Sequence, residues 1–331
     1  MDAVSNVSGL PQVAGLLLAE DRFLITPHTS PDPDAFGSCC GLALLLQQLG
    51  KQVVVYCDET VPQNCHFLTE GFPVSTELPA DIDRWKVLFL DGGEQHRQLK
   101  PVRALSIWMN LDHHLDNGRF AEWIYVDTNA AATSLIVAQL AEYLPVQMCA
   151  KTAECLFTGI LFDTRGGFVT DRCTGDLYRT VGKLVDAGAR PDDVNRQLHE
   201  QISQADLQVY GHALSAVKTR VNGQVVYTCL TREMQTLAGQ SDQAMEMITQ
   251  HLPKIQGGEV YVLFKEVAPE LVKVSLRSKG RIAVNEIAKQ FGGGGHKFAS
   301  GLRIDASLEE AIASVVPACE RAVQVDWART S

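Results

Sequence analysis

Residues 22–34 read RFLITPHTSPDPD and join a strand to a helix. The apolar run Arg22–Thr26, bounded by turn residues, predicts a short buried strand. The strand ends at Pro27-His28, and Asp34 opens a long apolar helix that stops at Gly50, a common residue just after a helix. Polar side chains that could carry chemistry therefore come directly after the first strong strand of the chain.

The alternation of strand and helix continues outward from this stretch. Further apolar strands are predicted at Gln52–Tyr56, Lys86–Leu90 and Leu105–Met109, and helices at Leu10–Glu20, Thr133–Tyr143, Thr152–Leu161 and Thr174–Ala187. This order predicts an α/β fold with a doubly wound, mostly parallel sheet as a catalytic domain over residues 1–190.

The pattern changes after residue 190. The segment Asp192–Val217 is polar and periodic, so we expect a connecting helix or linker over 191–214. Strands are then predicted at Gln224–Leu230, Glu259–Lys265 and Val272–Arg277, with fewer helices between them. We expect a second, smaller α+β domain over 215–331, and a chain of 331 residues is long enough for two domains.

Composition excludes several classes of protein. With 46% hydrophobic residues the chain can bury a core, so disorder is not its main state. A net charge of -10 argues against a grip on long duplex nucleic acid, which needs a positive surface. The nine cysteines form no C-x-x-C pair, and no targeting or membrane segment is visible, which predicts a reduced cytoplasmic protein without membrane partners.

Acids and histidines recur after the predicted strands. Besides the first stretch, Asp91 follows one strand, Asp112-His113-His114 follows another, and Asp163 follows an apolar segment. In an open α/β sheet the ligand crevice lies outside the carboxyl ends of the strands, so these clusters are expected to meet at one edge. The alternative is that acids after strands are helix caps and turn formers. Four such clusters at equivalent positions favour a site.

The donor types indicate a metal centre. Carboxylates packed together repel one another unless cations neutralise them. Imidazole with carboxylate, and no cysteine, suits manganese better than a structural zinc site, with magnesium as the next choice. The five or six donors exceed the needs of one ion, so two divalent metal ions are expected. Such a pair, about 4 Å apart, clamps a phosphoryl centre for in-line attack.

A second signal lies at Phe291–Lys297, which reads FGGGGHK. Glycines let the backbone approach a ligand closely and turn its N–H groups toward an anion. Between residues 271 and 303 there are seven basic side chains and one acidic, inside an acidic protein. A solvated face explains Lys289 and Arg303, whereas phosphate binding better explains Arg277, Ser278 and the glycine loop with His296.

Together these residues resemble the DHH phosphoesterase superfamily. Its four motifs match His28-x3-Asp32-x-Asp34, Asp91, Asp112-His113-His114 and Asp163-Thr164; its DHH-associated C-terminal domain matches Arg277-Ser278 with Gly292–Gly301; and a segment that often follows the DHH motif matches Asn129–Ser134. The resemblance covers nearly the whole chain. Without a sensory or membrane domain, the chain resembles the stand-alone nanoRNase (oligoribonuclease) and pAp-phosphatase type.

The resemblance implies a role for each matched residue. One metal would be held by His28, Asp32 and Asp91, and the other by Asp34, Asp91, His113 and Asp163. Asp91 would bridge the metals, His114 would contact the scissile phosphate, and Asp112 would orient a histidine. The rest of the substrate would be held by Arg277, Ser278, Gly293, Gly294, Gly295 and His296. The active site would lie in the cleft between the two domains.

The implied reaction is hydrolysis of RNA fragments of a few nucleotides to mononucleotides, with removal of the 3′-phosphate of pAp as a second activity. One alternative is a phosphodiesterase for cyclic or linear dinucleotides, and another is a nucleotide-binding module without catalysis. The sequence leaves the oligomeric state open, with a homodimer as one alternative. Gly92, Arg165 and Ala283 depart from the family pattern and leave the substrate preference undecided.

Overall fold

The computed structural model describes residues 5–70, 74–168, 170, 172–237 and 243–330, without the side chains of residues 5–6, 246, 296 and 327–330. The chain divides into two compact units, Met1–Gln201 and Ile202–Ser331. The boundary between them falls inside the segment 191–214 that the sequence analysis assigned to a linker. Each unit has its own sheet and its own buried core.

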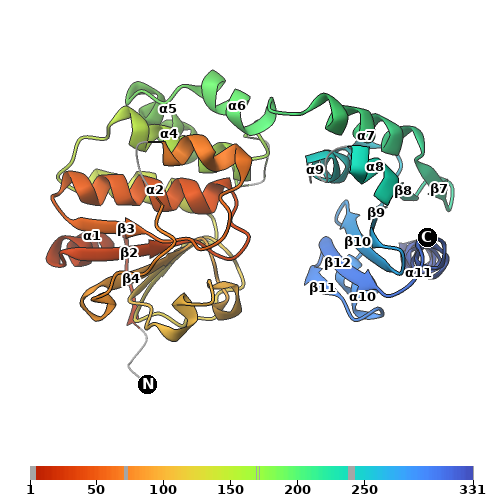
Figure 1. Ribbon diagram of the computed structural model, residues 1–331, viewed down its shortest axis with the longest axis horizontal. Coiled ribbons are helices and arrows are strands. Elements are labelled where there is room, and N and C mark those ends of the chain that lie inside the picture. Colours follow the sequence, from red (N-terminus) through yellow and green to blue (C-terminus); the bar gives the residue numbers. More distant parts are fainter. Residues whose placement is uncertain (1–4, 71–73, 169, 171, 238–242, 331) are drawn as a thin grey trace. The chain divides into compact units, whose positions relative to one another are not determined.

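The first unit is built on a parallel sheet (Figure 1). Its strands are β1 (Ser5–Asn6), β2 (Arg22–Thr26), β3 (Gln52–Val55), β4 (Lys86–Leu90), β5 (Met109–Asp112) and β6 (Trp123–Val126). They lie in the order β1-β6-β5-β4-β2-β3, and every neighbouring pair is parallel. The predicted mostly parallel α/β sheet is therefore confirmed, and β2, β4 and β5 end side by side at its carboxyl edge.

Helices lie between these strands and after the last of them. They are α1 (Leu10–Ala19), α2 (Pro33–Gln48), α3 (Thr133–Leu140), α4 (Ala150–Asp163), α5 (Gly175–Asp186) and α6 (Pro191–His199), with short 3₁₀ helices η1 (Gln63–Thr69), η2 (Ile82–Arg84), η3 (Gln95–Arg97), η4 (Val102–Ala104) and η5 (Ala141–Tyr143). Helix α2 is buried along most of its length and packs closely on α4 (Figure 1). Glycine at position 37 permits this approach, because a Cβ there would lie 2.5 Å from the carbonyl oxygen of Cys155.

The second unit holds a mixed sheet. Its strands are β7 (Lys218–Arg220), β8 (Val225–Leu230), β9 (Val260–Ala268), β10 (Leu271–Ser278), β11 (Gly294–His296) and β12 (Ala299–Ile304), and its helices are α7 (Gln204–Ser215), α8 (Arg232–Leu237), α9 (Gln243–His251), η6 (Leu252–Lys254), α10 (Val284–Lys289) and α11 (Leu308–Thr330). The order is β11-β12-β10-β9-β8-β7. Within the described residues of this second sheet, β8 and β9 are parallel and the other neighbouring pairs are antiparallel. The predicted smaller α+β domain is confirmed.

Both faces of this second sheet are covered. Along β9, Val262 belongs to an apolar cluster with residues of α10 and α11, whereas its neighbours Tyr261 and Leu263 belong to a cluster with residues of α7 and α9. Successive strand residues point to opposite faces, so a strand that is apolar on both faces must lie between two helical layers.

Two element predictions were wrong. The strand expected at Leu105–Met109 lies at Met109–Asp112. Ile107 and Trp108, just before it, are buried although they are not part of the strand, so the apolar pattern predicted a start that is too early. The connecting helix over 192–217 is broken into α6 and α7. Ser203 is the reason: its hydroxyl accepts the amide of Asp206 at 3.0 Å as a helix cap, which requires an extended backbone at Ser203.

Some elements were not predicted at all. Strand β6 and the long C-terminal helix α11 lay in sequence that carried no assignment. No disulfide bond joins any of the nine cysteines in the described part of the chain. None of the described helices is long and apolar enough to cross a membrane.

Candidate active site

The predicted site residues of the first unit meet at the carboxyl edge of its sheet. His28 follows β2, Asp91 follows β4, and His113 follows β5, and these three strands are neighbours. The remaining acids come from helix ends. Asp32 caps α2, its carboxylate accepting the amide of Ala35 at 3.0 Å, and Asp34 lies in the first turn of that helix. Asp163 is the last residue of α4.

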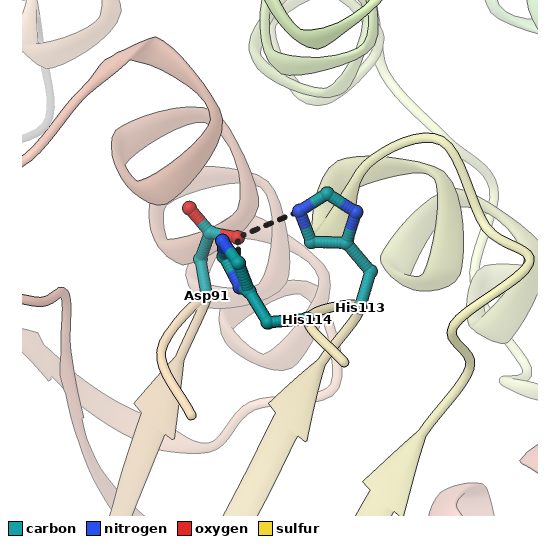
Figure 2. Close-up of side chains that lie close together, drawn as sticks. All are labelled: Asp91, His113 and His114. Carbon is teal, nitrogen blue, oxygen red and sulfur yellow. Dashed lines mark ion pairs between the residues drawn. The ribbon is translucent and has the colours of Figure 1, made fainter. Parts of the chain in front are cut away.

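Asp91 lies between the histidines of this edge (Figure 2). Its Oδ1 is 3.5 Å from Nε2 of His113 and 3.9 Å from Nδ1 of His114, and Figure 2 shows both rings directed at this carboxylate. Its Oδ2 is 3.7 Å from Nε2 of His28. The two oxygens of this buried carboxylate therefore contact different histidines.

Three groups of donor atoms could hold a metal ion in the described part of the chain. They are Asp91 with His113 and His114, His28 with Asp32 and Asp91, and Asp34 with His113 and Asp163. Within each group the donor atoms lie within 4.8 Å of one another. The structure thus brings together all six residues that the sequence suggested as ligands, with Asp91 and His113 each in two groups.

The donor set fits a divalent metal. Nε2 of His113 is buried, lies 3.2 Å from Oδ2 of Asp163, and makes no hydrogen bond to any described residue. Nδ1 of His28 lies 2.8 Å from the carbonyl oxygen of Thr29. A proton on Nδ1 would be donated there, which leaves the Nε2 lone pair facing the carboxylates, as in a metal-binding histidine.

The pKa shifts of the site residues show that several charged groups lie close together. Burial and the charges of Asp91 and Asp163 raise the pKa of Asp34 well above its ordinary value. Burial is also the main cause that raises the pKa of Asp163 to about 6. Burial lowers the pKa of His28, but the nearby carboxylates of Asp32 and Asp91 outweigh this effect and bring the pKa to about 10. In the metal-free protein, protons supply the positive charge that cations would otherwise bring.

The start of α3 contacts two of these acids, a feature that the sequence analysis did not assign. The amides of Thr133 and Ser134 donate to the Asp34 carboxylate at 2.7 and 2.9 Å, and the Thr133 hydroxyl donates to Asp91 Oδ1 at 2.9 Å. The only signal in the sequence was the segment Asn129–Ser134, which resembled a family segment without a stated role.

Asp112 lies behind the histidines and outside the three donor groups. Its Oδ1 accepts the Nδ1–H of His114 at 2.7 Å and the backbone amide of His113 at 2.8 Å. Its Oδ2 accepts the side-chain amide of Asn117 at 2.8 Å. With both oxygens engaged and the side chain fully buried, Asp112 is held by its neighbours in one orientation.

Two arginines approach the metal-site histidines from the side of Nδ1. Nη2 of Arg97 is 3.0 Å from Nδ1 of His28, and Nη1 of Arg172 is 3.3 Å from Nδ1 of His113. The sequence analysis gave no site role to either arginine, because neither lies in a motif. Both bring positive charge to an edge that is otherwise rich in carboxylates.

The substrate residues expected in the second unit lie on or beside two strands of its sheet, one on each side of β12. Arg277 and Ser278 end β10, while Gly294 and His296 belong to β11, and β12 separates the two strands. Arg277 and His296 are both register partners of Ala299 on β12. The structure therefore brings the two segments together, although the side chain of His296 lies outside the described part.

Local chemistry in the second unit suits an anion. Arg277 is partly buried and makes no ion pair with a described residue, and burial lowers its pKa. The Ser278 hydroxyl oxygen accepts the amides of Gly280 and Ile282, so its own proton is left to donate. Gly295 has φ 132, and a Cβ there would lie 2.8 Å from the Ala299 carbonyl oxygen, which only glycine tolerates.

The three departures from the family pattern lie in different local settings. A Cβ at Gly92 would lie 2.6 Å from the ring of Phe89, so packing under the loop after β4 favours glycine. Arg165 takes a left-handed φ of 59 in the turn after α4. Ala283 precedes α10 and offers that helix no side-chain cap. None of the three removes a member of the donor groups.

Comparison with known proteins matches both units. The model of the DHH family N-terminal domain matches residues 22–160, and that of the DHHA1 domain matches residues 222–324. The bifunctional oligoribonuclease and PAP phosphatase NrnA of Thermus thermophilus is 31% identical over 310 residues, covering 92% of each chain. The protein of the same name from Bacillus subtilis is 27% identical, covering 86% of this chain and 90% of the relative.

Solved structures agree with the fold. An exopolyphosphatase-related protein from Bacteroides fragilis superimposes with a TM-score of 0.84 at 25% identity, covering 95% of each chain. Exonuclease RecJ bound to manganese gives a TM-score of 0.54 at 16% identity, covering 98% of this chain and 96% of RecJ. From the motifs, the two domain matches and the full-length relatives together, the chain belongs to the DHH family, with a DHHA1 domain in its second unit.

Proposed function

We propose that this protein is a metal-dependent phosphoesterase that hydrolyses short RNA oligonucleotides to mononucleotides and removes the 3′-phosphate of pAp. One observation carries the proposal: two donor groups, one with His28 and one with His113, meet at the two oxygens of Asp91. A carboxylate shared in this way is the arrangement needed to hold two cations a few ångströms apart. The names of the full-length relatives support the substrate class.

The ligands divide between the two sides of Asp91. His28 and Asp32 would hold one cation with Asp91 Oδ2, while Asp34, His113 and Asp163 would hold the other with Asp91 Oδ1. When bound, two divalent cations, manganese as the first choice and magnesium as the second, activate water at neutral pH and neutralise charge on the phosphate. The protein's part is to fix the six ligands in a buried edge of the sheet.

His114 and Asp112 would act on the substrate side. The side chain of His114 is 31% exposed, against 2% for His28, so it can meet a substrate phosphate. Asp112 holds the Nδ1–H of His114 and directs the other ring nitrogen outward. A protonated His114 would stabilise charge that develops on the phosphate oxygens, and the neighbouring carboxylates Asp91 and Asp112 raise its pKa against the effect of burial.

The second unit would hold the other end of the substrate. Arg277, the Ser278 hydroxyl and the backbone of Gly293, Gly294 and Gly295 would bind a phosphate or terminal nucleotide, with His296 beside them. Arg277 is partly buried and has no carboxylate partner among the described residues, so its charge is available to bind an anion.

The test is turnover of 5′-labelled RNA of increasing length, from dinucleotides upward, alongside pAp and a cyclic dinucleotide. Each substrate is assayed with manganese, with magnesium and with a chelator. Manganese-dependent loss of the shortest RNAs, with release of phosphate from pAp, is the expected result. Preferential turnover of the cyclic dinucleotide would assign the site to second-messenger hydrolysis instead, and binding without turnover of any substrate would contradict catalysis.

Asp91→Asn supplies the matched test of the site. It keeps the size of the side chain but removes its charge, so turnover should fall to the level measured with the chelator. Asp176→Asn is the control, because Asp176 is an exposed acid at the start of α5 whose partner is Arg179. Equal activity of both variants would show that Asp91 is not a metal ligand.

A further inference from the structure

The first turn of α3 lacks an ordinary cap. The first backbone N–H groups of a helix have no partner within the helix and usually receive one from a Ser, Thr, Asn or Asp just before it. The residue before α3 is Ala132, which has no such side chain. The amides of Thr133 and Ser134 instead donate to the two oxygens of Asp34, 99 and 100 residues away in sequence.

This contact does two things at once. It caps α3, and it fixes the plane of the Asp34 carboxylate, since each oxygen receives one amide. Each oxygen keeps a second lone pair, so Asp34 can still donate to a cation in the group with His113 and Asp163. The positive end of the helix dipole also favours the charged form of this fully buried acid.

The same turn reaches the shared carboxylate. The hydroxyl of Thr133 donates to Oδ1 of Asp91, the oxygen on the His113 side, while Oδ2 faces His28. Asp91 itself has φ 59, a left-handed backbone that is unusual for a residue other than glycine. The carboxylate can still turn about the Cα–Cβ and Cβ–Cγ bonds, and the hydrogen bond from the Thr133 hydroxyl opposes both rotations.

The first turn of α3 packs closely against two other helices. A Cβ at Gly159 of α4 would lie 2.1 Å from Oγ of Ser134 and 2.4 Å from Oδ1 of Asp34. A Cβ at Gly37 of α2 would lie 3.2 Å from the same Ser134 oxygen. Both neighbouring helices therefore pack directly on the turn that contacts the carboxylates, and this packing opposes its displacement.

We propose that the first turn of α3 is the shared positioning element of the metal centre, and that Thr133 is the positioning residue that keeps Asp91 bridging its two sides. This inference rests on the two-metal site of the proposed function. Without the hydroxyl, the Asp91 carboxylate can rotate so that both oxygens turn to one side. One cation would then lose a ligand while the other keeps its full set.

The test compares Thr133→Val, which has the same shape without the hydroxyl, with Thr133→Ser, which keeps it. Calorimetric titration of manganese into chelator-stripped full-length protein gives the affinity and number of ions, and electron paramagnetic resonance shows whether two manganese ions are magnetically coupled. Neither readout needs a substrate. Thr158→Val is the control, because the hydroxyl of that buried threonine bonds only to the Glu154 carbonyl of its own helix among described groups.

We expect parent, Thr133→Ser and Thr158→Val to bind two coupled ions. Thr133→Val should bind one of them about 10- to 100-fold more weakly, the usual effect of losing a group that orients a ligand, and the coupled spectrum should give way to that of isolated ions. Thr133→Ala, which adds no bulk, replaces the valine variant if that variant does not fold.

Two results would overturn the inference, and they are distinguishable. If the parent binds two ions and Thr133→Val binds them with the same affinity and coupling, the positioning role is wrong while the proposed function stands. If the parent itself does not bind two ions, the metal centre of the proposed function is wrong, and the inference falls with it.

Discussion

Among the histidines of the site, His114 is the most exposed and has the strongest single partner. Its Nδ1 lies 2.7 Å from Oδ1 of Asp112, a carboxylate that is fully buried and also bound to Asn117. A buried acid with such contacts sets the tautomer and direction of the ring rather than taking part in the reaction itself. The effect of Asp112 on catalysis should therefore pass through His114.

That dependence predicts a non-additive pair. His114→Ala should lower kcat by at least about 100-fold, within the range for a group that acts in the transition state, and Asp112→Asn should cause a smaller loss. In the double variant the second change should add little, because residues that act as a unit are strongly non-additive. Steady-state kinetics on a labelled dinucleotide measures all four proteins, and additive losses would contradict a shared role.

The pKa of His28 predicts how the metal-free protein responds to pH. Its pKa is about 10, above the ordinary value of 6.5, so its protonation stabilises the fold fully below pH 6.5 and this stability is lost as pH rises toward 10. Asp163, raised to about 6, acts in the same direction at lower pH, whereas the lowered pKa of Asp91 matters only in acid. Thermal unfolding in chelator should therefore show Tm falling from pH 6.5 to pH 10.

Thermal unfolding of the manganese-bound protein can be compared with that of the metal-free protein. Metal binding needs neutral imidazoles and ionised carboxylates, so the affinity for manganese rises with pH. Saturation of the protein with manganese should therefore weaken or reverse the fall in Tm. His28→Gln in chelator should flatten the slope, because it removes one of the titrating groups. A Tm that stays level in chelator between pH 6.5 and pH 10 would contradict the protonated state of the site histidines.

At the scale of elements, the site depends on how closely α4 approaches α2 and α3. The approach is set by glycine: Gly159 faces Ser134 and Asp34, and Gly41 of α2 faces Leu156, whose Cδ2 would lie 2.4 Å from an added Cβ. Helices α2 and α4 are buried along most of their length. A single methyl group at the contact should therefore disturb both packing and ligands.

Gly159→Ala tests that contact. Its methyl group would overlap Ser134 and Asp34, so we expect a loss of about 1–3 kcal/mol in the free energy of unfolding, together with weaker manganese binding. Gly182→Ala is the matched control in α5, where an added Cβ meets nothing within 4 Å. That exposed helical position should gain about 0.5–1 kcal/mol from the same change. Denaturant unfolding measures both, and similar effects at the two positions would contradict the packing argument.

At the scale of the whole molecule, the two units differ in what stabilises them. All the donor groups described above lie in the first unit, whereas the second is held by two apolar clusters, one on each face of its sheet. A ligand that binds only the folded form stabilises the part of the structure that it holds. Removal of metal should therefore act unevenly along the chain.

Hydrogen exchange of the intact chain, read by peptide, measures this difference. Manganese at about 100 times its dissociation constant should raise the opening free energy of peptides from α2, β4, α3 and α4 by up to about 2.7 kcal/mol. Peptides from the core of the second unit, such as β9 and α11, should exchange at the same rate with metal and with chelator. Equal protection across both units would contradict a metal centre confined to the first.

The class of the fold could be predicted from the sequence alone, and so could the residues proposed for the site. Apolar strands followed by helices predict a parallel sheet, and parallel strands end at a common edge, so His28, Asp91 and His113 could be expected to meet although 63 and 22 residues separate them. The same reasoning did not place β5 correctly or find β6, because short buried apolar runs carry no periodicity that fixes their ends.

Only the tertiary structure decided how those residues work together. It showed that Asp91 divides its oxygens between two groups, and that α3 begins on Asp34 and Asp91 from about 100 and 42 residues away. No local pattern encodes such contacts, because they depend on strand register and on the distance that Gly159 and Gly37 allow between helices. The sequence states which residues are present, but the direction of each side chain depends on packing between segments that are far apart in the chain.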